Sequence, residues 1–196
     1  MFVTNYDPPL KRKPKAVGGI EERLTEAAVM LALATHILSD GRKGEVRVHP
    51  DGEHAKRFDI ARWLTANRFE KVSTLGSTHY GGVYRRGEQD IIINPKSGLG
   101  DVTGVIDGRP VHVECKGGTI NTSHAGQNSK LRRGLCEAVG LLMARQSDQA
   151  REIAAVPWTQ MTERLAKNMT TRCAKAGIEI ALIKRDGSIL WNRDIV

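Results

Sequence analysis

The 196-residue sequence predicts an α/β fold in which a central mixed β-sheet is flanked by helices. Two observations lead to this prediction. A helical apolar pattern is followed by several short apolar strands, then by two more helices and further strands. Parallel and antiparallel pairing are therefore both expected. An Asp-Gly pair at Asp107 and Gly108, between two apolar runs, is also a strong signal for a β-hairpin.

Length and composition indicate one globular domain, and the formal net charge of +8 favours a polyanionic partner such as nucleic acid. Basic charge is also common in proteins without such a partner. The three cysteines are odd in number and lack CxxC spacing, so they predict neither a disulfide framework nor a structural zinc site. This cysteine usage fits a reducing compartment, and a cytoplasmic protein is expected.

Residues 1–19 contain three prolines, a basic cluster and a Gly-Gly pair, and we expect them to form a flexible basic arm. Residues 20–196 are expected to form a single domain. Within it, residues 20–50 make an N-terminal helical extension, with a helix over about 20–39 and a short strand at 45–48. The apolar stretch of that helix is too short to span a bilayer, and its spacing predicts an amphipathic helix.

Residues 51–196 are expected to form the core of the domain. Its predicted elements are a helix over 53–66, strands near 69–74, 80–85 and 89–94, a loop over 95–100, the hairpin, a loop over 117–128, helices over 129–146 and 159–176, and strands over 178–183 and 188–192. The helix over 129–146 is expected to bury a stripe made of Leu131, Leu135, Val139, Leu142 and Met143. Asp186-Gly187 predicts that the last two strands form a C-terminal β-hairpin.

The hairpin brings charged residues together. If Asp107 and Gly108 form its loop, Asp101 lies directly across from Glu114, and Lys116 shares the face of Glu114. The opposite face carries Val111, Val113 and Cys115. Two carboxylates facing each other across a ladder repel, so this pattern predicts a divalent-metal site.

The predicted pairing depends on the register. A three-residue loop or a bulge would shift it by one residue and place Asp101 on the opposite face. The competing interpretation is a surface hairpin with scattered charges.

An aspartate at the start of one strand and Glu-x-Lys on the next, with helices on either side, resembles the restriction-endonuclease-like PD-(D/E)xK nuclease superfamily. The matching residues are Asp101 and Glu114-Cys115-Lys116, which Gly117 and Gly118 follow. Gly100 stands where many members have proline. The resemblance covers residues 90–146 most clearly and extends to 184. It implies a restriction-endonuclease-like core with the element order α-β-β-β-α-β.

The resemblance also implies a mechanism. Asp101 and Glu114 would hold Mg²⁺ or Mn²⁺, with the backbone carbonyl of Cys115 as a third ligand. Lys116 would be the third catalytic residue, beside Asp101 and Glu114, and would orient the attacking water or stabilise the developing charge.

Several other residues are weaker candidates. Members of the superfamily often take a further acid from the helix before the first core strand, and four residues could supply it here: Glu22, Glu26, Glu53 and Asp59. A solvated charge on a helix face is the favoured interpretation for each of them, and the sequence does not choose among the four. Asp90 also begins an apolar strand and competes with Asp101 as the motif aspartate. Spacing predicts an ion pair between Arg133 and Glu137.

Five residues are candidate nucleic-acid contacts. His112 is expected beside Glu114, opposite Thr103. The start of the helix after the motif carries the other four: Gln127, Lys130, Arg132 and Arg133. Surface solvation is the competing interpretation for these four.

The favoured function is a Mg²⁺-dependent nuclease, with DNA as the expected substrate and an endonuclease of restriction, phage defence or repair type as the expected setting. Cutting both strands would require a homodimer or a larger complex, and no membrane partner is expected. The alternatives are a non-catalytic nucleic-acid-binding or assembly subunit and a metal-dependent enzyme acting on a small phosphorylated substrate. The presence of Asp101, Glu114 and Lys116 together favours the nuclease.

Overall fold

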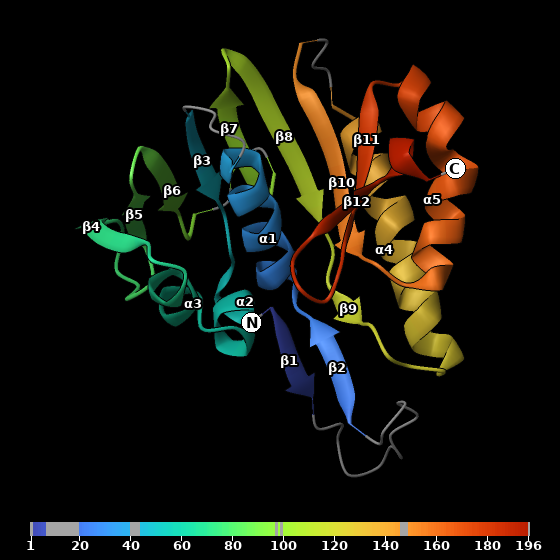
Figure 1. Cartoon of the computed structure of the whole chain (residues 1–196), viewed down its shortest axis with the longest axis horizontal. Coiled ribbons are helices and arrows are strands. Elements are labelled where there is room, and N and C mark those ends of the chain that lie inside the picture. Colours follow the sequence, from blue (N-terminus) through green and yellow to red (C-terminus); the bar gives the residue numbers. More distant parts are fainter. Residues whose placement is uncertain are drawn as a thin grey trace.

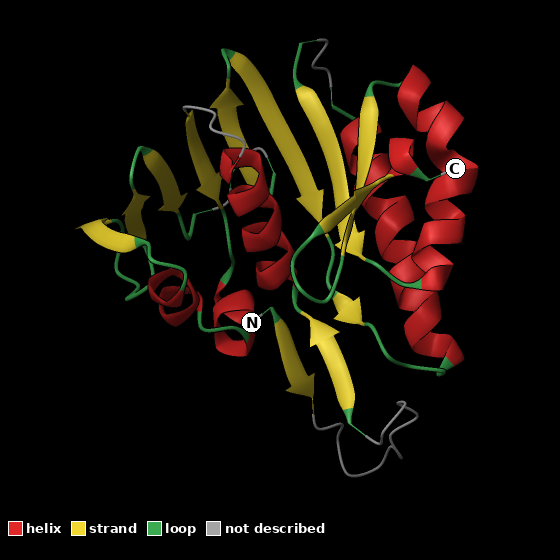
Figure 2. Ribbon diagram, in the orientation of Figure 1, coloured by secondary structure: helices red, strands yellow, loops and turns green. Residues whose placement is uncertain are grey.

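The expected α/β class is confirmed by a computed structural model, which describes residues 2–6, 20–39, 44–96, 98, 100–145 and 149–195. A nine-stranded mixed sheet forms the centre and helices flank it, while three short strands form a second, smaller sheet (Figures 1 and 2). Within the described part of the chain, no helix combines the length and the apolar character needed to cross a membrane.

The large sheet has the strand order β12-β11-β10-β8-β7-β3-β6-β5-β4. Its strands in chain order are β3 (Gly44–Val48), β4 (Glu70–Thr74), β5 (Gly82–Arg86), β6 (Gln89–Ile93), β7 (Val102–Ile106), β8 (Arg109–Cys115), β10 (Arg151–Pro157), β11 (Ile178–Ile183) and β12 (Ile189–Trp191). β7 pairs antiparallel with both β3 and β8, whereas β8, β10 and β11 run parallel to one another. β11 and β12 form the expected C-terminal hairpin.

Helices cover both faces of this sheet. The long helices are α1 (Glu26–Ser39), α4 (Ala125–Met143) and α5 (Gln160–Lys175). The shorter helices α2 (Gly52–Arg57) and α3 (Ile60–Ala66) follow β3 in the chain. Side chains alternate along β10, so Ile153 and Ala155 belong to the core around α1, whereas Ala154 and Val156 pack with α4 and α5. α4 connects β8 to β10, because parallel neighbouring strands need such a crossover.

The hairpin forms in the predicted register. Asp107 and Gly108 have φ values of 54° and 77°, as a two-residue type I′ turn requires. The ladder then pairs Ile106 with Arg109 and Val102 with Val113. One face of β8 is buried in the α1 core through Val111, Val113 and Cys115, as predicted. Glu114 lies on the other face.

The N-terminal prediction was partly wrong. Within residues 1–19, Val3–Tyr6 form strand β1, which pairs with β2 (Glu21–Leu24) and through it with β9 (Gly118–Thr119). Residues 7–19 lie outside the described part of the chain. Because Glu21–Leu24 form β2, the helix expected from residue 20 begins only at Glu26. It is not amphipathic either, because residues 27–34 are all buried.

Three core elements also differ from prediction. Strand β10 was not predicted, because its short apolar run follows a helix and ends at a proline. The helix expected over 53–66 is divided, because Phe58 is extended and Asp59 caps α3 by accepting from the backbone N–H of Arg62. α4 begins earlier than expected, at a cap formed by His124, and Met143 at its end is exposed rather than buried.

The close approach of β3 and β7 at Gly104 gives a test of the sheet. A Cβ at this position would lie 2.7 Å from the backbone oxygen of Glu45, so Gly104→Ala must push the two strands apart. We expect it to lower the free energy of unfolding by about 1–3 kcal/mol in chemical denaturation.

The matched control is Gly140→Ala, where nothing lies within 4 Å of the added Cβ on the exposed side of α4. It should raise the free energy of unfolding by about 1 kcal/mol, because alanine favours the helix. Equal stability of Gly104→Ala and the wild type would contradict the tight packing of β3 on β7.

Candidate functional site

A cleft with a volume of about 710 Å³ opens at one end of the large sheet, where β3, β6 and β8 end and β7 begins. Charged and polar side chains dominate its lining. The lining residues are Glu26, His49, Asp51, His54, Pro95, Gly98, Gly100, Asp101, Glu114 and Arg145. The two motif carboxylates therefore share one cleft.

Asp101 is fixed by backbone contacts on both of its neighbouring strands. Its N–H donates to the carbonyl of Val113 at 3.0 Å, and its carbonyl accepts from the N–H of His49 at 2.8 Å. Its side-chain Oδ2 accepts from the N–H of Cys115 at 2.7 Å. The carboxylate consequently lies against the end of β8, next to Glu114.

The two carboxylates influence each other electrostatically. Burial raises the pKa of Glu114, and the charge of Asp101 raises it further, whereas Arg145 and Lys116 lower it. Burial also raises the pKa of Asp101, although the hydrogen bond from Cys115 and the charge of Lys116 oppose this shift. The nearby cations therefore do not fully offset burial and repulsion, and the pair would gain from a bound cation.

Arg145 is a partner that the sequence did not indicate. Its Nη2 donates to Oε1 of Glu114, and both residues are largely buried. The guanidinium also passes close to Gly100, where a Cβ would lie 3.1 Å from Nη1 and from Nη2. Arg145 follows the end of α4 and is distant from the motif in sequence, so no local pattern could have linked it to Glu114.

Lys116 reaches carboxylates on two different helices. Its Nζ lies 3.2 Å from Oε1 of Glu137 on α4 and 3.7 Å from Oε1 of Glu26 on α1. Burial alone would lower the pKa of Lys116, but Glu26 and Glu137 outweigh burial and raise it. Lys116 is therefore a cation at neutral pH. The expected pair of Glu137 with Arg133 is replaced by this contact with Lys116.

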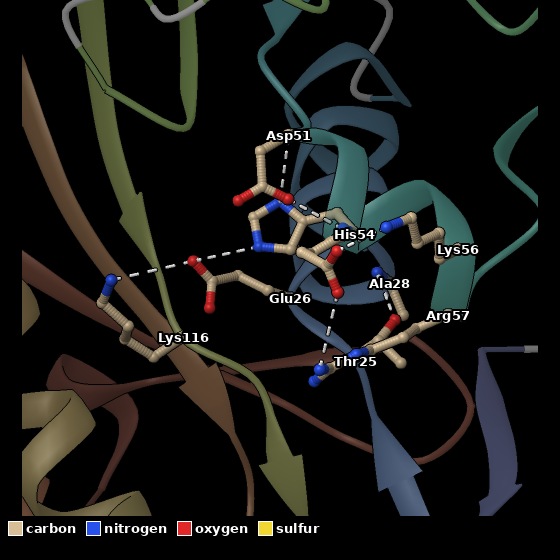
Figure 3. Close-up of polar contacts among 9 residues, drawn as sticks. Thr25, Glu26, Ala28, Asp51, His54, Lys56, Arg57 and Lys116 are labelled. Carbon is tan, nitrogen blue, oxygen red and sulfur yellow. Dashed lines mark hydrogen bonds and ion pairs between the residues drawn. The ribbon is translucent and has the colours of Figure 1, made fainter.

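Of the four candidate acids, the structure brings Glu26 into the cleft. Figure 3 shows its carboxylate between Lys116 and His54, with the Nε2 of His54 at 3.6 Å from Oε1. Burial and the charge of Asp101 raise the pKa of Glu26, whereas Lys116 and His54 lower it.

The other three candidate acids have different roles. Glu53 is exposed and pairs with Lys56 at 2.7 Å, Asp59 caps α3, and Glu22 pairs with Arg185. They are therefore structural or solvated charges rather than parts of this site.

His54 is held in one orientation by the start of α2. Its Nδ1 accepts from the backbone N–H of Asp51 at 3.1 Å, while its own backbone N–H donates to Oδ1 of Asp51 at 2.8 Å. Because Nδ1 accepts, Nε2 carries the proton and points it toward Glu26. Sequence reasoning missed this role, although an aspartate three residues before a histidine, directly after a strand, is a visible capping signal.

The remaining candidates lie in four different environments. His112 is half-buried opposite Thr103, as predicted. A second group on α4 is exposed and consists of Lys130, Arg132 and Arg133. Gln127 does not belong with them, because it is buried in the first turns of the helix. Asp90 forms a two-bond ion pair with Arg85 at the start of β6, at the far end of that strand from the cleft.

The oxygen donors of the cleft suit a hard divalent cation such as Mg²⁺, provided that Arg145 moves away from Glu114. Across the described residues, no group of three or more His, Cys, Asp or Glu side chains is assembled to hold a metal. The carboxylate oxygens of Asp101 and Glu114 are nevertheless the donors that Mg²⁺ and Mn²⁺ prefer, and Mg²⁺ usually binds one or two carboxylates and keeps several waters. Glu114 can serve in this way if Arg145 moves away from it.

Comparison of the chain with family models, with curated proteins and with solved structures found no match in any of the three. The function is therefore inferred from the chemistry of the cleft.

The mutual influence of the two carboxylates can be measured directly. Asp101→Asn removes the neighbouring negative charge but keeps an oxygen that can accept from Cys115. We expect the pKa of Glu114, followed by side-chain carbon NMR, to fall toward its ordinary value of 4.5. Asp90→Asn should leave the pKa of Glu114 unchanged. A pKa that moves with Asp90 and not with Asp101 would show that the pairing is wrong.

The pH dependence of stability should distinguish the same two aspartates. The pKa of Asp101 is raised in the folded state, so its charge destabilises the fold above that pKa, and the penalty disappears as the pH falls to the ordinary value of 3.8. Asp101→Asn should therefore raise the Tm at about pH 8, with a gain that vanishes in acid.

Asp90 should behave in the opposite way. Its pKa is lowered by the hydrogen bonds from Arg85, so its charge stabilises the fold above its unfolded pKa and this contribution is lost as the pH falls through the folded pKa. Asp90→Asn should lower the Tm at about pH 8. Thermal unfolding across the pH range checks both signs, and an unchanged or lower Tm for Asp101→Asn at about pH 8 would contradict the burial penalty.

Proposed function

We propose that this protein is a Mg²⁺- or Mn²⁺-dependent nuclease that hydrolyses phosphodiester bonds, with DNA as its substrate. The observation that carries the proposal is the meeting of Asp101 and Glu114, one from each arm of a hairpin, in a cleft that Lys116 adjoins. The net charge of +8 fits a polyanionic substrate.

The order of elements supports a restriction-endonuclease-like core. α1, β3, β7, β8, α4 and β10 follow one another in the order α-β-β-β-α-β, with α2, α3 and β4–β6 inserted between β3 and β7. The two motif segments then occupy β7 and β8, at the centre of the sheet. The inserted strands extend the sheet beyond β3.

The chemistry divides among the residues of the cleft. A bound divalent ion would lower the pKa of a water molecule and polarise the scissile phosphate. Asp101 and Glu114 would hold it, together with the carbonyl of Cys115. Lys116 keeps its proton at neutral pH, so it acts as a positive charge and hydrogen-bond donor rather than as a base. Glu26 holds the ammonium group of Lys116 near the cleft.

One observation favours a second candidate, a non-catalytic nucleic-acid-binding or assembly subunit with the same fold. Arg145 supplies a positive charge directly to Glu114, so this carboxylate has a counterion even without a metal. The two candidates differ in whether a divalent ion replaces that contact. Concerted cleavage of both strands would use two such clefts, supplied by a second copy of the chain or by a partner.

The proposal is tested by a cleavage screen. Purified protein should cut at least one of plasmid, linear, single-stranded, branched or modified DNA when Mg²⁺ or Mn²⁺ is present, and it should stop when EDTA is added. Lys116→Ala and Asp101→Asn should each reduce the rate on the order of 100-fold or more, because the first removes a positive charge at the reacting phosphate and the second removes a charged ligand of the divalent ion.

The matched control is Lys175→Ala, an exposed lysine at the end of α5 and away from the cleft residues. It should cut like the wild type. Cleavage that survives in Lys116→Ala at the wild-type rate would point to a contaminating nuclease and would favour the non-catalytic subunit.

A further inference from the structure

Three polar atoms near the cleft are buried without a hydrogen-bond partner among the described residues. They are Nη1 of Arg145, Nδ1 of His112 and Oε1 of Glu152. A buried polar group without a partner costs free energy, so three in one region call for an explanation. Glu152 is the most enclosed of the three residues, with 6% of its surface exposed.

The strand register places these residues on one face. β8 and β10 pair His112 with Glu152 and Glu114 with Ala154. Side chains at alternate positions share a face, so Glu152 lies beside His112 on the face that also carries Glu114. Glu152 is therefore a second carboxylate on this face, on the strand next to that of Glu114. α4 packs against both strands.

The positive charge of Arg145 acts on both carboxylates and lowers the pKa of each. One of its terminal nitrogens donates to Glu114, and the other has no hydrogen-bond partner among the residues that the structure describes. Burial raises the pKa of Glu152, and the charge of Arg145 opposes that shift, so the guanidinium acts on Glu152 without bonding it. The guanidinium packs closely against Gly100, where a Cβ would lie only 3.1 Å from Nη1 and from Nη2.

We propose that Arg145 alternates between Glu114 and Glu152, and that Glu152 is a positioning residue that holds the guanidinium away from Glu114 when a divalent cation binds there. This inference rests on the proposed function, because it assigns Glu114 to the cation. In the metal-free state Arg145 pairs with Glu114. In the metal-bound state Arg145 pairs with Glu152, and each buried charge again has an opposite charge beside it.

The first test needs no metal. Thermal unfolding in EDTA compares Glu114→Gln, Glu152→Gln and the double variant. Each single variant should change the Tm by only a few degrees, because Arg145 pairs with the remaining carboxylate. The double variant should lose about 10 °C beyond the sum, because Arg145 is left buried without a counterion.

Two results of this cycle would overturn the alternation. One is a double variant whose Tm equals the sum of the single changes. The other concerns rescue. Adding Arg145→Met to the double variant removes the buried charge that has no counterion, so it should restore most of the lost Tm. A Tm that stays low in the triple variant would overturn the alternation. This rescue is the readout even if the double variant does not fold.

The second test measures Mn²⁺ binding by calorimetry on the intact protein, without nucleic acid. Glu152→Gln should weaken Mn²⁺ binding roughly 10-fold or more, because Arg145 then stays on Glu114. In an Arg145→Met background, Glu152→Gln should have no effect. Equal weakening in both backgrounds would mean that Glu152 acts on the metal directly, and it would overturn the positioning role.

The two tests separate this inference from the proposed function. A wild-type protein that binds no Mn²⁺ would overturn the nuclease proposal and the positioning role with it. Additive unfolding with normal Mn²⁺ binding would overturn the alternation of Arg145 and leave the nuclease proposal standing.

Discussion

The two-residue turn at Asp107 and Gly108 decides which side chains of β7 and β8 face each other. Its positive φ values join the strands without an extra residue, so the pairing continues in step to the far end of the ladder. There Asp101 meets the end of β8, where Glu114 is located. β3 and β10 pair with the outer edges of this hairpin, so the register of the central strands depends on it.

Charge around the cleft is arranged in a chain of opposite signs. The carboxylates of Glu26 and Glu114 are each balanced by a basic side chain, Lys116 and Arg145 respectively, while Asp101 accepts from a backbone N–H. Burial nevertheless raises the pKa of all three acids, so keeping them ionised costs the fold stability. The cluster at the end of the central strands therefore lowers the stability of the fold.

Local patterns were enough to predict the hairpin, its register and the shared face of Glu114 and Lys116, because a period of two and an Asp-Gly turn act over neighbouring residues. They were not enough for Arg145 or His54, whose roles arise only when distant elements pack. Glu26 could not be separated from other helix acids for the same reason. Strand β10 was missed because a short apolar run looks alike in a buried strand and a buried helix, and the pairing with β8 decides between them.

The residues of the cleft come from segments far apart in the chain, from α1 near the beginning to the end of α4. Their assembly also depends on parallel pairing of β8 with β10, which closes a long loop before it gains contacts. Such nonlocal pairing makes folding slow. A chain still emerging from the ribosome, with residues 151–157 not yet made, has no β10 to pair with β8, so its central sheet cannot be completed before that point.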